Sequence, residues 1–321
     1  MTSYSKWIPA SRDEPVFDVA ERSLRARLGA VEHFLPLAAH QAHESIEHVH
    51  QLRVWSRRAT AAIRLYRDLC PWVRSGRVKK QLTKIRRAAN DARDADVLLL
   101  RLEKDQNEPG AARLLERARK HRAQSQQPLV AIFDKMESGD RFRRQMENLL
   151  SSLRERAQSN ALRSARFGPW ARANLRPYLD QFFHDGQAPL SDLGALHQFR
   201  ISGKKLRYTM ELLAAAFPLR FAKRLYPKIE SLQERLGEIN DLATAQLRYR
   251  HWLEEAESES EVEYIRGLLA DEEDRLRRCR EAFSAWWKPP RVRRLAKAFH
   301  DIIRPRKRCL PATNHAFSGE K

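Results

Sequence analysis

The sequence has few of the residues that form tight turns or cross-link a secreted domain. Among its 321 residues there are 11 Gly, 15 Pro and 3 Cys. An all-β fold needs many tight turns, so the small supply of Gly and Pro argues against one. The three cysteines (Cys70, Cys279 and Cys309) share no motif spacing and cannot all pair, which favours a reducing compartment over a disulfide framework.

Long apolar stretches are also lacking. No run approaches the roughly 18 apolar residues of a membrane-spanning helix, and the N-terminal sequence MTSYSKWIPASRDEP has no apolar core of the kind found in signal peptides. There is no Walker loop and no other glycine-rich phosphate cradle. We therefore expect a cytoplasmic protein with no membrane span and no nucleotide-type phosphate loop.

Positive charge is the most prominent feature that is present. The chain has 61 Lys and Arg against 41 Asp and Glu, a formal net charge of +20. Such a balance attracts polyanions at long range, and nucleic acid, an anionic membrane surface and polyphosphate are all candidates at this point.

The composition and the apolar spacing predict an all-α protein. Arg, Leu, Ala and Glu are abundant, and apolar residues recur at helical spacing from about 15 to 40. Ser45 is placed to cap a second helix. Residues 1–14 are expected to be a loose leader. Pro289-Pro290 is expected to end regular structure and to leave 291–321 as a basic C-terminal tail.

An internal repeat organises the chain. His50-Gln-Leu-Arg53-Val-Trp-Ser-Arg57-Arg58 aligns without a gap with His197-Gln-Phe-Arg200-Ile-Ser-Gly-Lys204-Lys205, an offset of 147 residues, and the same offset carries Arg93-Asp94 onto Asn240-Asp241. Two motifs that share one offset indicate a duplication. The two halves are then about 15–160 and about 165–290.

Both copies of the first motif place their basic side chains on one helix face. At 100° per residue, His50, Arg53, Arg57 and Arg64 share an arc of about 60°, opposite an apolar side that includes Trp55. His197, Arg200 and Lys204 repeat this arc, while Glu211 takes the place of Arg64 and could hold a basic neighbour.

The basic arc has no internal neutralisation in the sequence. Between Arg53 and Arg67 there is no acidic residue, and like charges four residues apart on a helix repel one another. A solvated helix face normally intersperses Glu. We therefore expect an external anion to relieve this repulsion, with a plain solvated face as the alternative.

At these residues the sequence resembles the CHAD family, the conserved-histidine α-helical domain. The matching segments are HVHQLRVWSRR at 48–58, Arg93-Asp94-Ala-Asp96, LHQFRISGKKLRY at 196–208 and LGEIND at 236–241. The resemblance covers about 15–290. It implies two pseudo-symmetric antiparallel helical bundles with a basic groove or pore between them. It also implies non-catalytic binding of inorganic polyphosphate, without a cofactor, and association with polyphosphate granules.

Carried over by position, the resemblance implies a set of polyphosphate ligands on the motif helices and their neighbours. They are His50, Arg53, Arg57, Arg58, Arg64, Lys80, Lys84, His197, Arg200, Lys204, Lys205, Arg207 and Lys228. Arg suits phosphate because its planar fork donates two parallel hydrogen bonds, whereas Lys acts as a point charge. The charge of the two histidines would rise below about pH 6.5.

Three alternatives remain open on the sequence. Weak, non-specific nucleic-acid binding could rest on the basic residues after Lys288. A metal site could form if His40, His43, Glu47 and His50 shared one continuous helix, although a cap at Ser45 would break that register and no metal is expected. Asp94, Asp96 and Asp241 could bind Mg²⁺ in a phosphohydrolase, but pairing of these carboxylates with arginine is the preferred interpretation.

Overall fold

The computed structural model describes residues 4–105, 107–108, 110–137, 140–159 and 163–304. In this part of the chain there are ten α-helices and no strand, which confirms the predicted all-α class. The α-helices are α1 (Val16–His40), α2 (Ile46–Leu65), α3 (Trp72–Leu102), α4 (Ala111–Glu137), α5 (Arg141–Ser159), α6 (Phe167–Asp185), α7 (Leu193–Leu213), α8 (Tyr226–Glu254), α9 (Glu259–Trp286) and α10 (Pro289–Ile303).

Local side-chain chemistry sets several helix starts. The Ser45 side chain accepts a hydrogen bond from the Glu47 amide and so caps α2, as predicted, and Asp192 caps α7 through the Ala195 amide. The oxygen of Ser258 accepts from the Glu261 amide at the start of α9. These side chains satisfy amide groups that have no partner inside the helix.

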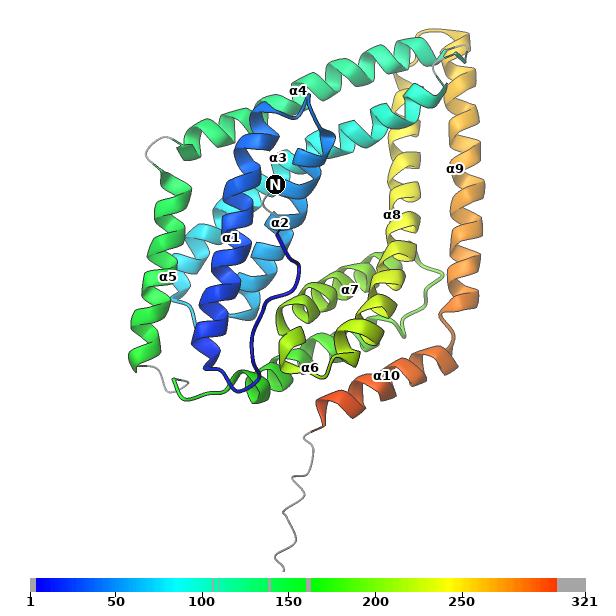
Figure 1. Cartoon of the computed structure of the whole chain (residues 1–321). Coiled ribbons are helices and arrows are strands. Elements are labelled where there is room, and N and C mark those ends of the chain that lie inside the picture. The colour runs from blue at the N-terminus through cyan, green and yellow to red at the C-terminus, as the bar shows by residue number, and fades with distance from the viewer. Residues whose placement is uncertain (1–3, 106, 109, 138–139, 160–162, 305–321) are drawn as a thin grey trace, which may run out of the picture.

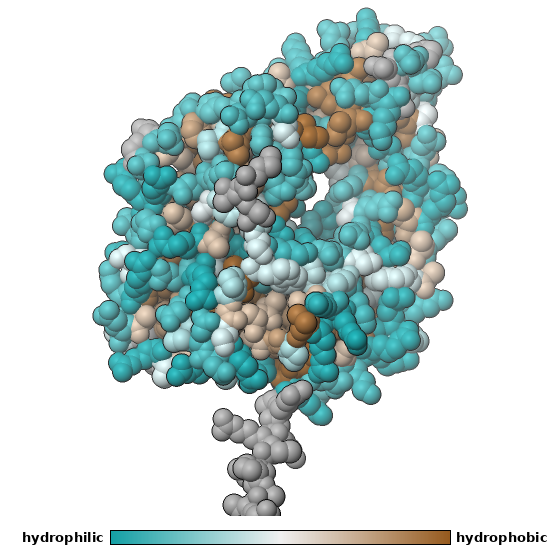
Figure 2. Space-filling view, viewed as in Figure 1, coloured by the Kyte–Doolittle hydropathy of each residue, from teal (hydrophilic) through white to brown (hydrophobic). Residues whose placement is uncertain are grey.

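The helices form two groups joined at α2 and α7. In the first group α1 packs on α2 and α5, and α2 packs on α3; in the second, α7 packs on α6 and α8. Helices α3 and α4 form one long arm, and α8 and α9 form another. The arms meet where α4 contacts α9, so the chain closes into a frame (Figure 1). The face seen in space-filling view is mostly hydrophilic and is hollowed between the two arms (Figure 2).

The N-terminal segment is not the loose leader that the sequence suggested. Ile8 is buried, and the fully buried Arg27 of α1 donates hydrogen bonds to the carbonyl oxygens of Ser5 and Lys6. The Trp7 ring packs edge-on against Tyr226 of α8 at 4.8 Å. Because these contacts pair both Nη atoms of a buried guanidinium and bury aromatic surface, residues 4–14 connect the two helix groups.

The predicted end of regular structure at Pro289-Pro290 is also wrong. These prolines occupy the first turn of α10, where the missing amide hydrogen would have no partner inside the helix. Leu295 and Phe299 of α10 are buried against the core. The predicted basic tail is therefore helical from its start at 291 to Ile303, and its remainder from 305 to 321 lies outside the described residues.

Candidate anion-binding site

The two motif helices present the faces that their periodicity predicts. On α2, Leu52, Trp55 and Ala59 are buried, and on α7, Phe199 and Leu206 are buried. These apolar sides pack into the core, and α2 contacts α7 directly. Burial of one side of each helix leaves the opposite, basic side turned away from the core.

The basic sides of the two helices converge. Lys204 of α7 is largely buried beside Arg200 of its own helix and Arg57 and Arg53 of α2. Burial, followed by the charges of these three guanidinium groups, lowers the pKa of Lys204 to about 7, and Asp241 of α8 opposes the shift. Burial and the nearby Arg57 likewise lower the pKa of Arg200. The structure thus brings together basic residues that lie about 150 positions apart in the sequence.

Two carboxylates lie beside arginines of this cluster, at the long end of ion-pair distances. Asp94 of α3 lies 3.7 Å from Nη1 of Arg53, and Asp241 of α8 lies 4.0 Å from Nη2 of Arg200. The two pairs are related by the repeat offset of 147. Both distances are long for an ion pair, and the Asp241 side chain is 78% exposed, so each pair contributes little to stability.

Some donor groups of the cluster lack partners. The Nε atoms of Arg53 and Arg200 and Nη1 of Arg93 are buried, and none makes a hydrogen bond to any part of the chain that the structure describes. Buried polar groups are nearly always satisfied in folded proteins. An anion with several oxygen acceptors could satisfy such groups.

The two histidines have different neighbours. His50 is half-buried; burial, together with the charges of Arg93, Arg53 and Arg57, lowers its pKa despite the opposing effect of Glu47. His50 therefore gains its charge below the ordinary range that the sequence suggested. His197 is exposed, and its Nδ1 lies 3.2 Å from Oδ1 of Asn240, which is the counterpart of Arg93 in the second copy of the repeat.

Arg58 and Arg207 are held by an internal carboxylate rather than left free. Nε of Arg58 lies 2.8 Å from Oε2 of Glu211, and Nη1 of Arg207 lies 3.8 Å from Oε1 of the same buried residue. The Tyr226 hydroxyl also donates to Glu211 at 2.8 Å. The expected tethering of a basic neighbour by Glu211 is confirmed. Arg58 thereby joins the two helix groups, and both arginines have less freedom to bind a ligand.

The other predicted ligands are exposed or line a different pocket. Arg64 of α2, Lys80 and Lys84 of α3 and Lys205 of α7 are exposed. Lys228 lines a separate pocket with residues of α9 and α10. The structure therefore does not group all the predicted residues in one place.

The sequence reasoning missed Arg86 of α3. Burial, followed by the charges of Arg57, Arg87 and Arg64, lowers the pKa of Arg86, which shows that it extends the basic cluster along the α2–α3 surface. Arg86 and Arg93 are seven residues apart, a spacing that places both on one helix face. That periodicity could have identified them.

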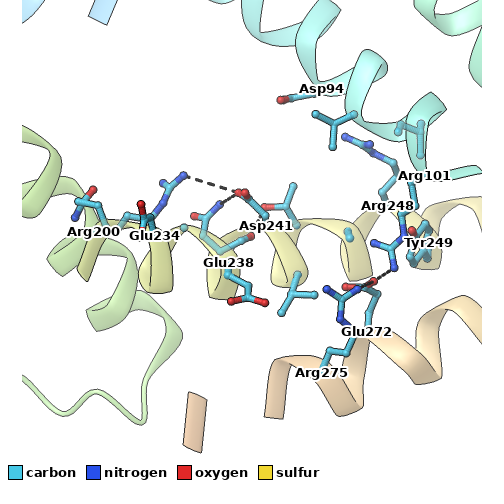
Figure 3. Close-up of a pocket in the computed structure, with 18 of the residues that line it drawn as sticks. Asp94, Arg101, Arg200, Glu234, Glu238, Asp241, Arg248, Tyr249, Glu272 and Arg275 are labelled. Carbon is cyan, nitrogen blue, oxygen red and sulfur yellow. Dashed lines mark hydrogen bonds and ion pairs between the residues drawn. The ribbon is translucent and has the colours of Figure 1, made fainter. Parts of the chain in front are cut away.

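A cavity of about 700 Å³ opens beside the cluster. Arg200 lies at one end, and Arg101 of α3 with Arg248 and Arg275 of the α8–α9 arm lie at the other (Figure 3). Arg53 also lines the cavity. Arg101 and Arg275 both pair with the fully buried Glu272. At that end, part of the positive charge is therefore already paired within the protein, and the Arg101–Glu272 ion pair joins the two arms.

The proposed metal ligands are separated by the cap of α2. His40 ends α1, whereas Ser45 caps the helix that carries His50. Among the described residues, no three His, Cys, Asp or Glu side chains come close enough to hold a metal ion together. Within the same residues, no helix has the length and apolar character needed to cross a bilayer.

Comparison with known proteins agrees with this architecture. Residues 22–250 match the model of the CHAD domain. The crystal structure of the CHAD domain from the plant Ricinus communis superposes with a TM-score of 0.68 at 19% identity, covering 93% of this chain and 96% of that one. PptA from Streptomyces chartreusis gives a TM-score of 0.60 at 18% identity, covering 86% of this chain and all of that one (100%). No curated protein matches the chain.

Proposed function

The chain belongs to the CHAD family, and on this premise we propose that it binds inorganic polyphosphate through the basic cluster at the α2–α7 contact. The observation that carries the proposal is the position of Lys204, largely buried among Arg53, Arg57 and Arg200. Clustered cations with a lowered lysine pKa represent an electrostatic cost in the ligand-free protein. A bound polyanion removes this cost.

The chemistry of the cluster suits a chain of phosphates better than a nucleic acid. Guanidinium groups match phosphate oxygens with paired hydrogen bonds. Proteins that bind single-stranded nucleic acid usually expose aromatic rings on which bases stack, whereas Trp55 and Tyr208 beside the cluster are buried, with the guanidinium groups of Arg58 and Arg207 over their rings. Nucleic acid is therefore the weaker candidate ligand.

We propose binding without turnover. Asp94 and Asp241, the carboxylates nearest the cluster, each lie beside an arginine, Arg53 and Arg200 respectively. This position suits a role in orienting the guanidinium groups. Recruitment of the protein to polyphosphate granules in the cytoplasm is part of the same proposal, since a granule presents many chains to one basic surface.

The test is a binding titration with polyphosphates of several chain lengths at fixed ionic strength. Arg53→Glu/Arg200→Glu should abolish tight binding, whereas Lys80→Glu/Lys84→Glu, which changes the same charge at exposed positions away from the cavity, should weaken it only slightly. Excess duplex DNA should not displace polyphosphate from the wild type. Equal losses in the two double variants, or easy displacement by DNA, would contradict the proposal. Release of orthophosphate with Mg²⁺, lost in Asp94→Asn, would contradict binding without turnover.

A further inference from the structure

A second basic pocket lies at the start of α8. Its volume is about 450 Å³, and it is lined by the start of α8, the end of α9 and the first turns of α10, namely Pro227, Lys228, Ser231, Trp286, Trp287, Arg291, Arg294 and Leu295. Lys228 and the cavity residue Gly237 are nine positions apart on α8, about 180° around the helix. The two hollows share no lining residue.

The positive charge in this pocket has no internal counter-charge. None of its lining residues is acidic, and the sequence has no acid between Glu281 and Asp301. Lys228, Arg291 and Arg294 form no ion pair with any described carboxylate. Some surface arginines elsewhere have a carboxylate partner, as Arg25 has Glu147. In this pocket three basic side chains share one hollow with no acidic lining residue.

Trp286 holds one cation of the pocket in place. The guanidinium of Arg291 lies 4.4 Å from the centre of the Trp286 ring, and that of Arg235 lies 4.8 Å from it. Trp287 is fixed by a hydrogen bond of 2.9 Å from its Nε1 to the Gly186 carbonyl. A stacked arginine is ordered before a ligand arrives, and its in-plane hydrogens remain available for phosphate oxygens. Ordering in advance lowers the entropic cost of binding.

The same contacts identify the ligand class. Two guanidinium groups already lie over the Trp286 ring, so it offers little surface for a stacked base. The remaining recognition elements are point charges and guanidinium forks, which suit a phosphate-rich anion without bases. The pocket residues from Trp286 onward also lie beyond residues 22–250, the segment that matches the CHAD domain.

We propose that this pocket is a second phosphate-binding site, which holds a segment of polyphosphate outside the central cavity. The identity of the anion rests on the proposed function, but the site itself does not depend on the central cluster. A protein with two such sites binds long chains more tightly than either site alone, because the second contact becomes intramolecular.

The experiment is isothermal titration calorimetry with a short polyphosphate of defined length. Wild-type protein should bind two equivalents, Arg291→Glu/Arg294→Glu should bind one, and Arg53→Glu/Arg200→Glu should bind the other one. The matched control is Arg293→Glu/Lys297→Glu, which reverses two exposed charges on the same helix outside this pocket and should keep both equivalents. Thermal melts of all variants, and the milder Arg294→Gln, exclude unfolding as the cause of a loss.

The outcomes separate the two proposals. If Arg291→Glu/Arg294→Glu binds as many equivalents as the control pair, the second site is refuted. The central site is then judged separately, by whether Arg53→Glu/Arg200→Glu loses an equivalent. If only the α10 variant loses binding, the proposed function at the central cluster is refuted and the second site stands. Selective loss of oligonucleotide binding, with polyphosphate binding intact, would overturn the second site as a polyphosphate site.

Discussion

Replacement of Lys204 by arginine should remove a pH dependence from polyphosphate binding. In the ligand-free protein, burial and the charges of Arg200, Arg57 and Arg53 lower the pKa of Lys204 from 10.5 to about 7. A bound polyanion stabilises the charged form and raises this pKa again. Binding near neutral pH must therefore take up a proton at Lys204, and the affinity must fall as pH rises above 7.

The size of this effect follows from the fraction of Lys204 that is already protonated. A group with a pKa near 7 is about nine-tenths protonated at pH 6 and about one-hundredth protonated at pH 9. If the complex requires the charged form, the affinity falls by up to about 100-fold over this range. The sign for folding is opposite: between pH 7 and 10.5 the unfolded chain binds the additional proton, so the ligand-free protein should gain stability as pH rises through that window.

Affinity for long-chain polyphosphate, measured from pH 6 to pH 9 at constant ionic strength, tests this reasoning. Lys204→Arg keeps its charge throughout and should show a flatter profile, and calorimetry in buffers of different ionisation enthalpy should show less proton uptake. Lys205→Arg, at the exposed neighbouring position, should behave as wild type. Titration of the ligand's own terminal phosphates is common to all three proteins. A profile for Lys204→Arg as steep as that of wild type would refute the argument.

Three further outcomes are expected. Arg86→Glu should weaken polyphosphate binding and reduce the slope of log affinity against log salt by about one or more, because it removes a phosphate contact and adds a negative charge; an unchanged slope would place Arg86 outside the site. Glu211→Ala should lower the free energy of unfolding by about 3–5 kcal/mol in urea titrations, since it leaves Arg58 without its buried partner, and a loss below 1 kcal/mol would show that the pair is solvated. Gly203→Ala should change the free energy of unfolding by less than about 1 kcal/mol in the same assay, because a Cβ there would meet only the amide nitrogen at the far end of the flexible Gln233 side chain and alanine favours a helix interior; a loss above about 2 kcal/mol would show that Gln233 cannot move aside.

Helical periodicity predicted the parts of the structure that depend on local pattern. The two-faced character of α2, its cap at Ser45 and the apolar side containing Trp55 are confirmed. Each depends on residues within a few turns of one another, for which a rise of about 1.5 Å and a turn of 100° per residue are sufficient. The matched motifs at His50 and His197 likewise predicted that two similar basic faces exist.

Contacts between distant segments could not be predicted in the same way. The pairing of Arg58 with Glu211 joins residues 153 positions apart, and no local pattern distinguishes Arg58 from its free neighbour Arg57. The leader failed as a prediction because its few apolar residues, such as Ile8, have no periodicity, although they are buried against the helices. Pro289 was misread because proline both ends helices and begins them, and the buried face that follows decides between these outcomes.

The positions of the acidic residues, more than the number of basic residues, define the basic cluster. Buried carboxylates lie where helices must be held together: Glu211 at the α2–α7 contact, Asp96 with Arg122 between α3 and α4, and Glu272 with Arg101 between the long arms. Each commits a guanidinium to the fold, as expected for charges that cannot be buried unpaired. By contrast, Arg57 and Lys204 have no close carboxylate partner among the described residues. We therefore expect a ligand to bind most strongly where the chain has cations that its own fold does not pair.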